Sequence, residues 1–136
     1  MQYLAEMPDM TPIQGELQGQ VMAALWRLGA GTVEQVRSEL PPRYQGAYNT
    51  VQTVLNRLAE RTLLERKREG RGIVYRPRLT EAEYLSGTIR RTLAGASSDA
   101  RQAALASIIG GLDAAELSEV QKLAGQAGAA RRKRRP

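Results

Sequence analysis

Apolar residues recur at helical intervals in the first part of the chain. In residues 11–28 they are spaced by four, four and three positions, which is typical of one stripe on a helix: Leu17, Val21, Leu25 and Leu28. Thr11 and Pro12 suit the N-cap and the first helical position, so we expect the helix to begin there and to end at the "GAG" of residues 29–31. Trp26 lies off the stripe, and we expect it to pack under a neighbouring element.

Two more helices are predicted before residue 62. Thr32 and Gln35 form a capping box, which indicates a short helix that ends at Leu40, before "PPRYQG". In "YNTVQTVLNRLAER", residues 48–61, the apolar positions follow the i, i+3, i+4, i+7 pattern of a buried helical face: Val51, Val54, Leu55 and Leu58. The second and third helices are therefore joined by a short turn-like segment.

The period changes at residues 63–78. "LLERKREGRGIVYRPR" alternates, has β-branched residues in its second half and carries "EGRG" between the two halves. This pattern predicts a β-hairpin with a basic, glycine-containing tip, ended by Pro77. We refer to this hairpin as the wing.

The remainder predicts three further helices and a tail. Thr80 and Glu83 form a second capping box, and Ser98 and Asp113 are the expected caps of two short helices. Residues 126–136 are low in complexity and basic, and we expect them to be disordered. Residues 1–10 are expected to form a flexible N-terminus.

The order of elements predicts a fold that is mainly α with a small β-hairpin. Three helices followed by a two-stranded wing form the winged variant of the helix-turn-helix, and the third helix is then the recognition helix. We expect a winged helix-turn-helix DNA-binding domain over residues 11–78 and a helical dimerisation region over residues 79–125.

The polar face of the third helix carries amides and a hydroxyl where a merely soluble helix usually carries Glu and Lys. Amides can pair with adenine through two hydrogen bonds, and Thr can bond to bases or pack on the thymine methyl. The residues expected to contact DNA from this helix are Asn49, Gln52, Thr53, Asn56 and Arg57. A solvated polar face is the simpler interpretation, and the helix alone does not decide between them.

Positive charge is concentrated in two places. The net charge is +6, with seven basic and two acidic residues in 61–78 and five basic residues in 131–136. We expect the wing to lay its cations along the phosphate backbone, namely Arg66, Lys67, Arg68 and Arg71. Arg43 and Tyr48 flank the third helix and are expected to hold phosphates too. The alternative is an exposed strand edge that charge protects from aggregation.

The composition excludes several other functions. The chain has no Cys and no His, which removes disulfides, thiolate metal sites, Cys nucleophiles and imidazole catalysis. We find no Gly-rich phosphate loop, metal-spaced carboxylates or nucleophile elbow, so we expect no enzyme, no cofactor and no metal. A winged-helix module that binds RNA or protein remains the alternative, although the presumed contact face offers only Tyr48 for stacking. No apolar run reaches about 20 residues, so we expect a cytoplasmic protein without a membrane partner.

The C-terminal third is rich in apolar residues for three short helices. Such helices bury little surface by themselves, so we expect them to pair with a second copy of the chain. The residues expected at this dimer interface are Leu85, Ile89, Leu93, Leu105, Ile108, Ile109, Leu117, Val120 and Leu123. The basic tail is interpreted as solvated, with nonspecific DNA contact as the alternative.

The segment "AYNTVQTVLNRLAERTLLERKREGRGIVYRP" strongly resembles the penicillinase-repressor family, the BlaI/MecI-type regulators that also include copper-responsive repressors. The "YNTVQTVLNRL" core, the following "LL" and the closing "YRP" carry the resemblance, which extends in pattern over about residues 11–125. It implies a homodimeric transcriptional repressor that binds a dyad-symmetric, double-stranded DNA operator through a winged helix and dimerises through its C-terminal helices.

Two departures from the family concern its release signals. Some members are inactivated by cleavage at an Asn-Phe bond, and this chain has no Phe. Copper-type members carry a Cys-rich metal site, and this chain has no Cys. The inducing signal and the identity of any regulatory protease therefore stay open.

Overall fold

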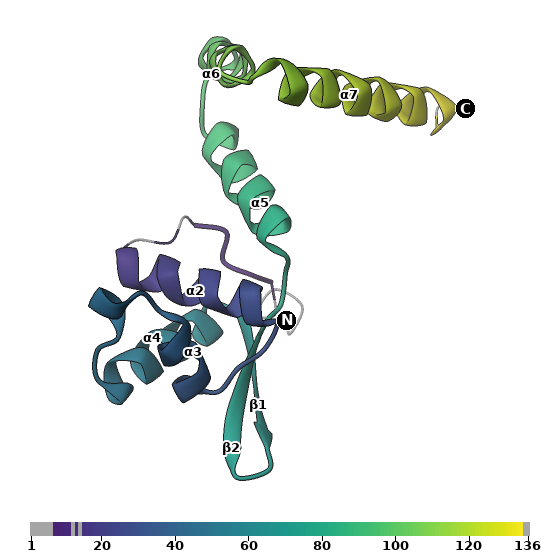
Figure 1. Cartoon of the computed structure of the whole chain (residues 1–136). Helices are drawn as coiled ribbons and strands as arrows, with labels where there is room; N and C mark the ends of the chain where they lie inside the picture. Colours follow the sequence, from purple (N-terminus) through teal and green to yellow (C-terminus); the bar gives the residue numbers. More distant parts are fainter. Residues whose placement is uncertain (1–6, 12, 14, 135–136) are drawn as a thin grey trace. The chain divides into compact units, whose positions relative to one another are not determined.

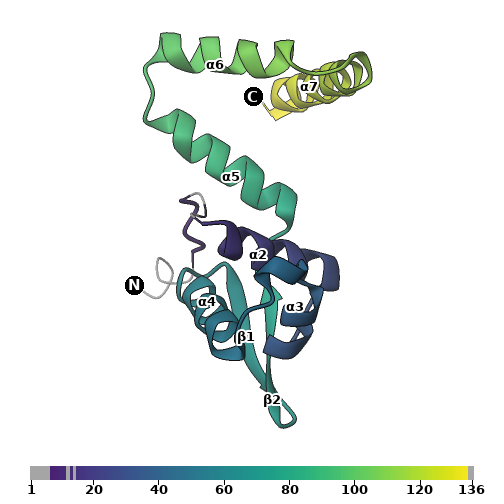
Figure 2. The same cartoon turned by 60° about the vertical axis from the view of Figure 1, so that its left-hand side comes forward.

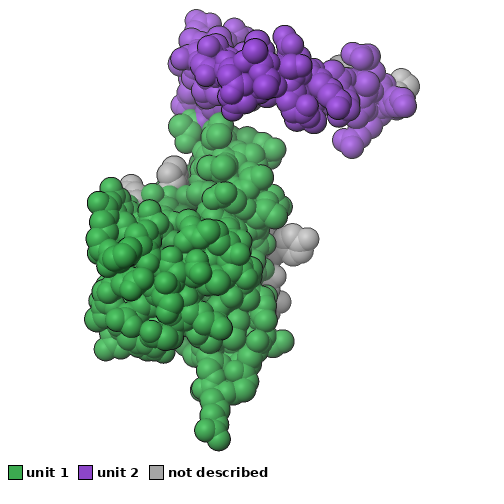
Figure 3. All heavy atoms as spheres, in the orientation of Figure 1, with its two compact units in different colours: residues 1–92 green, residues 93–136 purple. Residues whose placement is uncertain are grey.

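The computed structural model describes residues 7–11, 13 and 15–134 of the 136-residue chain (Figure 1). It confirms the predicted fold class, since the described residues are mostly helical with one two-stranded antiparallel sheet. The chain divides into two compact units, which meet between Thr92 and Leu93 (Figure 3). The elements in chain order are α2 (Glu16–Leu28), α3 (Val33–Glu39), the 3₁₀ turn η1 (Pro42–Tyr44), α4 (Tyr48–Glu60), β1 (Leu64–Glu69), β2 (Gly72–Pro77), α5 (Glu81–Ala94), α6 (Ser98–Gly110) and α7 (Ala114–Arg134).

Helix α2 begins at Glu16, four residues later than expected from the sequence. Its N-cap is Gly15, with φ at 91°, and not Thr11; Pro12 lies outside the described residues. The backbone N–H of Thr11 donates instead to Asp9 Oδ1 at 2.9 Å, so this part of the chain forms a local turn. Gly29, with φ at 80°, ends the helix as predicted.

The core of the first unit forms where α2, α3 and α4 pack together beside the hairpin (Figure 2). The predicted stripe of α4 is buried, as are Val33 and Val36 of α3. Of the predicted stripe of α2, Val21 and Leu25 are buried, Leu17 is half-buried and Leu28 is exposed. The capping box of Thr32 and Gln35 is present, with hydrogen bonds of 2.9 and 3.2 Å. Helical periodicity therefore identified all three helices, and capping placed the start of α3 correctly but not that of α2.

The wing is an antiparallel hairpin in which Leu64 pairs with Pro77 and Glu69 with Gly72. Gly70 takes a φ of 62° at its tip, a conformation that side chains other than glycine rarely adopt. Tyr75 of β2 also pairs with Gly31, through backbone hydrogen bonds of 3.0 and 2.9 Å. The base of the wing is thereby attached to the loop between α2 and α3.

Most of helix α5 belongs to the first unit, so this unit extends beyond residue 78, where we expect the DNA-binding domain to end. The Tyr84 ring lies 5.6 Å from the Trp26 ring, and Tyr84 Oη accepts a hydrogen bond of 2.7 Å from the Ile13 backbone. The connection from the wing to α5 is also anchored, because the Arg78 backbone N–H donates to the Leu63 carbonyl and Trp26 Nε1 donates to the Leu79 carbonyl, both at 3.0 Å. Trp26 thus packs under a neighbouring element, as predicted.

Residues 7–11 are held against the end of α4, in contrast to the flexibility expected of the N-terminus. The Asp9 backbone N–H donates to the Arg61 carbonyl at 2.9 Å, and Thr62 Oγ1 donates to the Met7 carbonyl at 2.9 Å. An ion pair of 3.1 Å joins Arg61 Nε to Asp9 Oδ2.

The second unit consists of helices without a buried residue among those described. Ser97 caps α6 in place of the expected Ser98, by accepting a hydrogen bond from the Ala100 N–H. Asp113 caps α7 as expected, with a bond of 2.8 Å from the Glu116 N–H. Helix α7 continues to Arg134, so the disorder expected from residue 126 is not found up to that point. Four cations in its last turn are favoured by the helix dipole.

None of the helices among the described residues is long and apolar enough to cross a membrane.

Candidate nucleic-acid interface

The polar surface of α4 consists of two stripes that face different surroundings. Tyr48, Gln52 and Asn56 stand four residues apart, and each lines a hollow that the wing also lines. Asn49, Thr53 and Arg57, one position further along, form an outer ridge that is exposed to solvent. The sequence prediction placed the four amide and hydroxyl residues together opposite the buried stripe. The structure corrects this, because Gln52 and Asn56 are half-buried and turned toward the wing.

The outer ridge presents one amide, one hydroxyl and one guanidinium. Thr53 Oγ1 donates a hydrogen bond of 2.8 Å to the Asn49 carbonyl, so its hydrogen is used within the helix. Its methyl group and oxygen lone pairs remain at the surface, where they can contact a thymine methyl or accept from a base. Within the described residues, no hydrogen bond occupies the side-chain amide of Asn49.

A hollow of about 210 Å³ separates the first half of α4 from the tip of the wing. Tyr48 and Gln52 line it from the helix, and Arg68 and Arg71 line it from the hairpin. Thr32 and Val33, at the start of α3, close one side. The structure therefore brings these four predicted site residues together around one groove.

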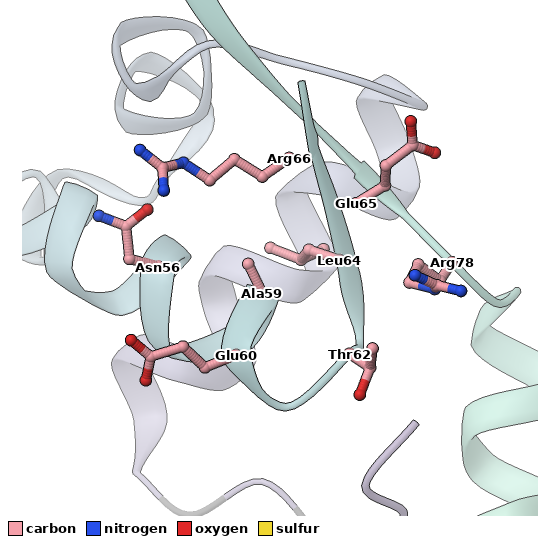
Figure 4. A pocket seen from close by; sticks show the side chains of 8 residues that line it. All are labelled: Asn56, Ala59, Glu60, Thr62, Leu64, Glu65, Arg66 and Arg78. Carbon is pink, nitrogen blue, oxygen red and sulfur yellow. The ribbon is translucent and has the colours of Figure 1, made fainter. Parts of the chain in front are cut away.

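A second hollow, of about 400 Å³, lies between the second half of α4 and the base of β1 (Figure 4). Asn56 borders it from the helix, and the guanidinium of Arg66 extends toward Asn56 from the strand (Figure 4). The amide oxygen of Asn56 accepts a hydrogen bond of 2.6 Å from the hydroxyl of Tyr75. Burial raises the pKa of Tyr75, an effect that Arg66 partly opposes, so the phenol stays protonated and donates at neutral pH.

The predicted cations of the wing are all exposed. Among the described residues none of the four, Arg66, Lys67, Arg68 and Arg71, forms an ion pair with a carboxylate. Alternation along β1 places Lys67 on the opposite face from Arg66 and Arg68. Arg76, which was not predicted as a site residue, forms a 2.7 Å ion pair with Glu69.

The sequence matches the penicillinase repressor family over residues 14–126. The chain belongs to this family. A transcriptional regulator BlaI of Mycobacterium tuberculosis is 37% identical over 110 residues, which are 79% of this chain and 80% of that protein. A penicillinase repressor of Bacillus licheniformis is 32% identical over 66 residues, covering 48% of this chain and 52% of that protein. The solution structure of the monomeric form of Bacillus licheniformis BlaI in complex with the blaP half-operator has a TM-score of 0.46 and 29% identity, and the match covers 57% of this chain and 94% of that one.

In this member of the penicillinase repressor family, Arg43 is engaged by neighbours of its own. It forms a 3.1 Å ion pair with Glu16 and lies over the ring of Tyr44, with Cζ 4.6 Å from the ring centroid. Arg43 also donates a hydrogen bond to the Tyr44 hydroxyl. The residue is exposed but is less free to contact a phosphate than the wing cations.

Sequence reasoning missed two residues of this family member, Arg37 and Gln45, whose side chains bind the backbone at the segment that leads into α4. Arg37 Nε donates to the Gly46 carbonyl at 2.7 Å, and Gln45 Nε2 donates to the Leu40 carbonyl at 2.7 Å. Both bonds fix the segment between α3 and α4. No sequence signal could have identified them, because their partners are backbone carbonyls.

Proposed function

We propose that the protein represses transcription as a homodimer that binds a dyad-symmetric DNA operator. The general activity, DNA-binding transcriptional repression, accompanies membership of the penicillinase repressor family. The homodimer, the symmetry of the operator and the role of each residue are the proposed parts. Because a repressor must reach the DNA that is transcribed, we propose that the protein acts in the bacterial cytoplasm.

The observation that carries the proposal is the separation of two chemistries on one side of the first unit. Amide and hydroxyl groups form the outer ridge of α4, and cations without carboxylate partners among the described residues lie on the wing across the groove. Amide and hydroxyl groups suit base edges in the major groove. Guanidinium and ammonium groups suit phosphates, which set affinity and register without reading sequence.

Exposed apolar side chains support the homodimer. Seven of the nine residues expected at the interface are exposed, and Leu93 and Leu117 are half-buried. The described part of the second unit buries no residue, so its helices have no core of their own. A second copy would cover these side chains, and the two-fold axis would require an inverted repeat with half-sites about 10 base pairs apart or a multiple of that.

The proposal is tested with two sets of variants and an operator selected from bound genomic fragments. Replacing Asn49 or Thr53 with Ala should reduce the discrimination between operator and random DNA by on the order of 1–3 kcal/mol. Replacing Arg68 or Arg71 with Ala should weaken binding to both DNAs alike and lower the salt slope by about 1.

Arg90→Ala, which removes an exposed cation from α5, is the matched control and should leave the salt slope unchanged. Identical behaviour of the helix and wing variants in salt-dependent titrations would show that the roles are wrongly assigned. If the protein enriches no genomic fragment in the selection, it binds no operator, and the proposed function is wrong.

A further inference from the structure

We propose that Asn56 is a positioning residue, which holds the wing at a fixed angle to the recognition helix through its hydrogen bond with Tyr75. This inference rests on the proposed DNA-binding function and replaces the expectation that Asn56 contacts DNA. The link joins one side chain from the second half of α4 to one from β2. Asn56 lines the hollow at the base of the wing, and Tyr75 lines the hollow beside its tip.

Tyr75 is attached to the first unit at three points. Its ring is fully buried in the core, its backbone pairs with Gly31 in both directions, and its hydroxyl donates to Asn56. The first two attachments fix β2 to the core and to the loop before α3. Only the third connects β2 to the polar side of the recognition helix.

The bond with Tyr75 uses one of the two lone pairs of the Asn56 amide oxygen and holds the side chain against the wing, which disfavours pairing with adenine. Bidentate pairing with adenine uses both the oxygen and the nitrogen of an amide. In Asn56 the oxygen is 2.6 Å from the Tyr75 hydroxyl, and the side chain is half-buried against the wing. Asn49 and Thr53, on the outer ridge, have no such neighbour from the wing, so base contacts belong to them.

The link acts on the phosphate contacts through the pairing of the two strands. Arg66 is the partner of Tyr75 in the hairpin register, and Arg68 follows two residues later on the same face. Fixing the Tyr75 hydroxyl to α4 therefore fixes where these two cations stand relative to the outer ridge. The spacing between base contacts and phosphate contacts is set by the Asn56–Tyr75 link.

The first test needs no DNA and measures amide hydrogen exchange of the full chain. Tyr75→Phe keeps the buried ring and removes only the hydroxyl, and Asn56→Ala removes the acceptor. Both should increase the exchange rates of the Val74–Arg76 amides relative to those of α2. Asn56→Asp keeps an acceptor oxygen and should retain the protection, which separates loss of the link from a general loss of packing. Unchanged exchange in Tyr75→Phe and Asn56→Ala would overturn the proposal.

The second test is a double-mutant cycle on operator affinity. Tyr75→Phe and Asn56→Ala should each weaken operator binding about three- to tenfold, with the ratio of operator to random affinity nearly preserved. The double variant should be no weaker than Asn56→Ala alone, because both changes remove one interaction.

The opposite pattern of affinities would show that Asn56 contacts a DNA base and does not act through Tyr75. In that case Asn56→Ala would reduce discrimination, Tyr75→Phe would bind like the parent chain, and the two effects would add. If the parent chain itself binds no operator, the proposed function fails, while the exchange experiment still decides whether the link exists.

Discussion

Arg61, the residue that follows α4, organises the N-terminal segment through one side chain. Its guanidinium pairs with Asp9 Oδ2 at 3.1 Å and also donates to the backbone carbonyls of Asp9 and Thr11. Hydrogen bonds from Thr11, with smaller contributions from Arg61, lower the pKa of Asp9 to about 2. The folded segment is therefore stabilised by the ionised form of the Asp9 carboxylate.

The attachment of this segment should depend on pH in the acid range. A carboxyl with a lowered pKa stabilises the folded form above its ordinary value of 3.8, and this contribution is lost as the pH falls toward about 2. The protection of the amides of residues 9–11, measured against the intrinsic exchange rate at the same pH, should therefore decrease as the pH falls between these values. Asp9→Asn should show fast exchange already at pH 6 and no acid transition in this window. An identical acid transition in Asp9→Asn would assign the effect to another group.

Single residues could be predicted from the sequence where the signal is local. The capping boxes at Thr32 and Thr80 involve residues three apart, and the buried stripe of α4 follows from its period alone. That Gln52 and Asn56 face the wing could not be predicted, because a helical wheel does not show which flank the hairpin covers. The ion pair of Arg43 with Glu16 joins residues 27 positions apart and has no local signal.

At the scale of elements, α5 belongs to the first unit up to Thr92 and packs on it through its first two turns. Tyr84 and Thr88 are its buried residues, and Tyr84 packs on Trp26 of α2. Leu85 and Ile89, which we expect at the dimer interface, lie on another face of α5 and are about half exposed. The sequence period places both faces on one helix, but it does not show which of them packs on α2.

Removing the Tyr84 ring should loosen α5 and lower the stability of the first unit. Tyr84→Ala should decrease the free energy of unfolding by about 3 kcal/mol, because it leaves a cavity beside Trp26. Trp26 is the only tryptophan of the chain, so a red shift of its fluorescence reports the exposure directly. Leu85→Ala, at the exposed neighbour, is the control and should leave the fluorescence of the monomer unchanged. Unchanged emission in Tyr84→Ala would contradict the packing.

At the scale of the whole molecule, the two units differ in how they are stabilised. The first has a core that includes fully buried side chains from all three of its first helices and from β2. The second exposes Ile108 at 54% and Leu123 at 52% of their surfaces. A chain that ends at Thr92 should therefore fold as a monomer, whereas one that ends at Arg78 should be less stable because it lacks Tyr84.

Assembly can be tested without shortening the chain. Ile108→Asp places a charge on an exposed position of α6, so the fold should persist while dimerisation, which would bury that charge, is lost. Sedimentation should give a monomer, and operator affinity should fall by orders of magnitude because the second half-site is no longer engaged intramolecularly. Gln102→Asp adds the same charge to α6 at an exposed residue outside the predicted interface and should remain dimeric. If Ile108→Asp sediments as a dimer, α6 is not the interface.

Only three residues, Arg78, Leu79 and Thr80, lie between the end of β2 and the start of α5, and each is held. Arg78 bonds to Leu63, Leu79 to Trp26, and Thr80 caps the helix. These bonds hold the connection in one conformation, so the wing and the first turns of α5 do not move independently of each other in the folded protein. In the proposed complex with DNA, the entropy of such independent motion is not lost a second time, because the wing is already oriented before binding.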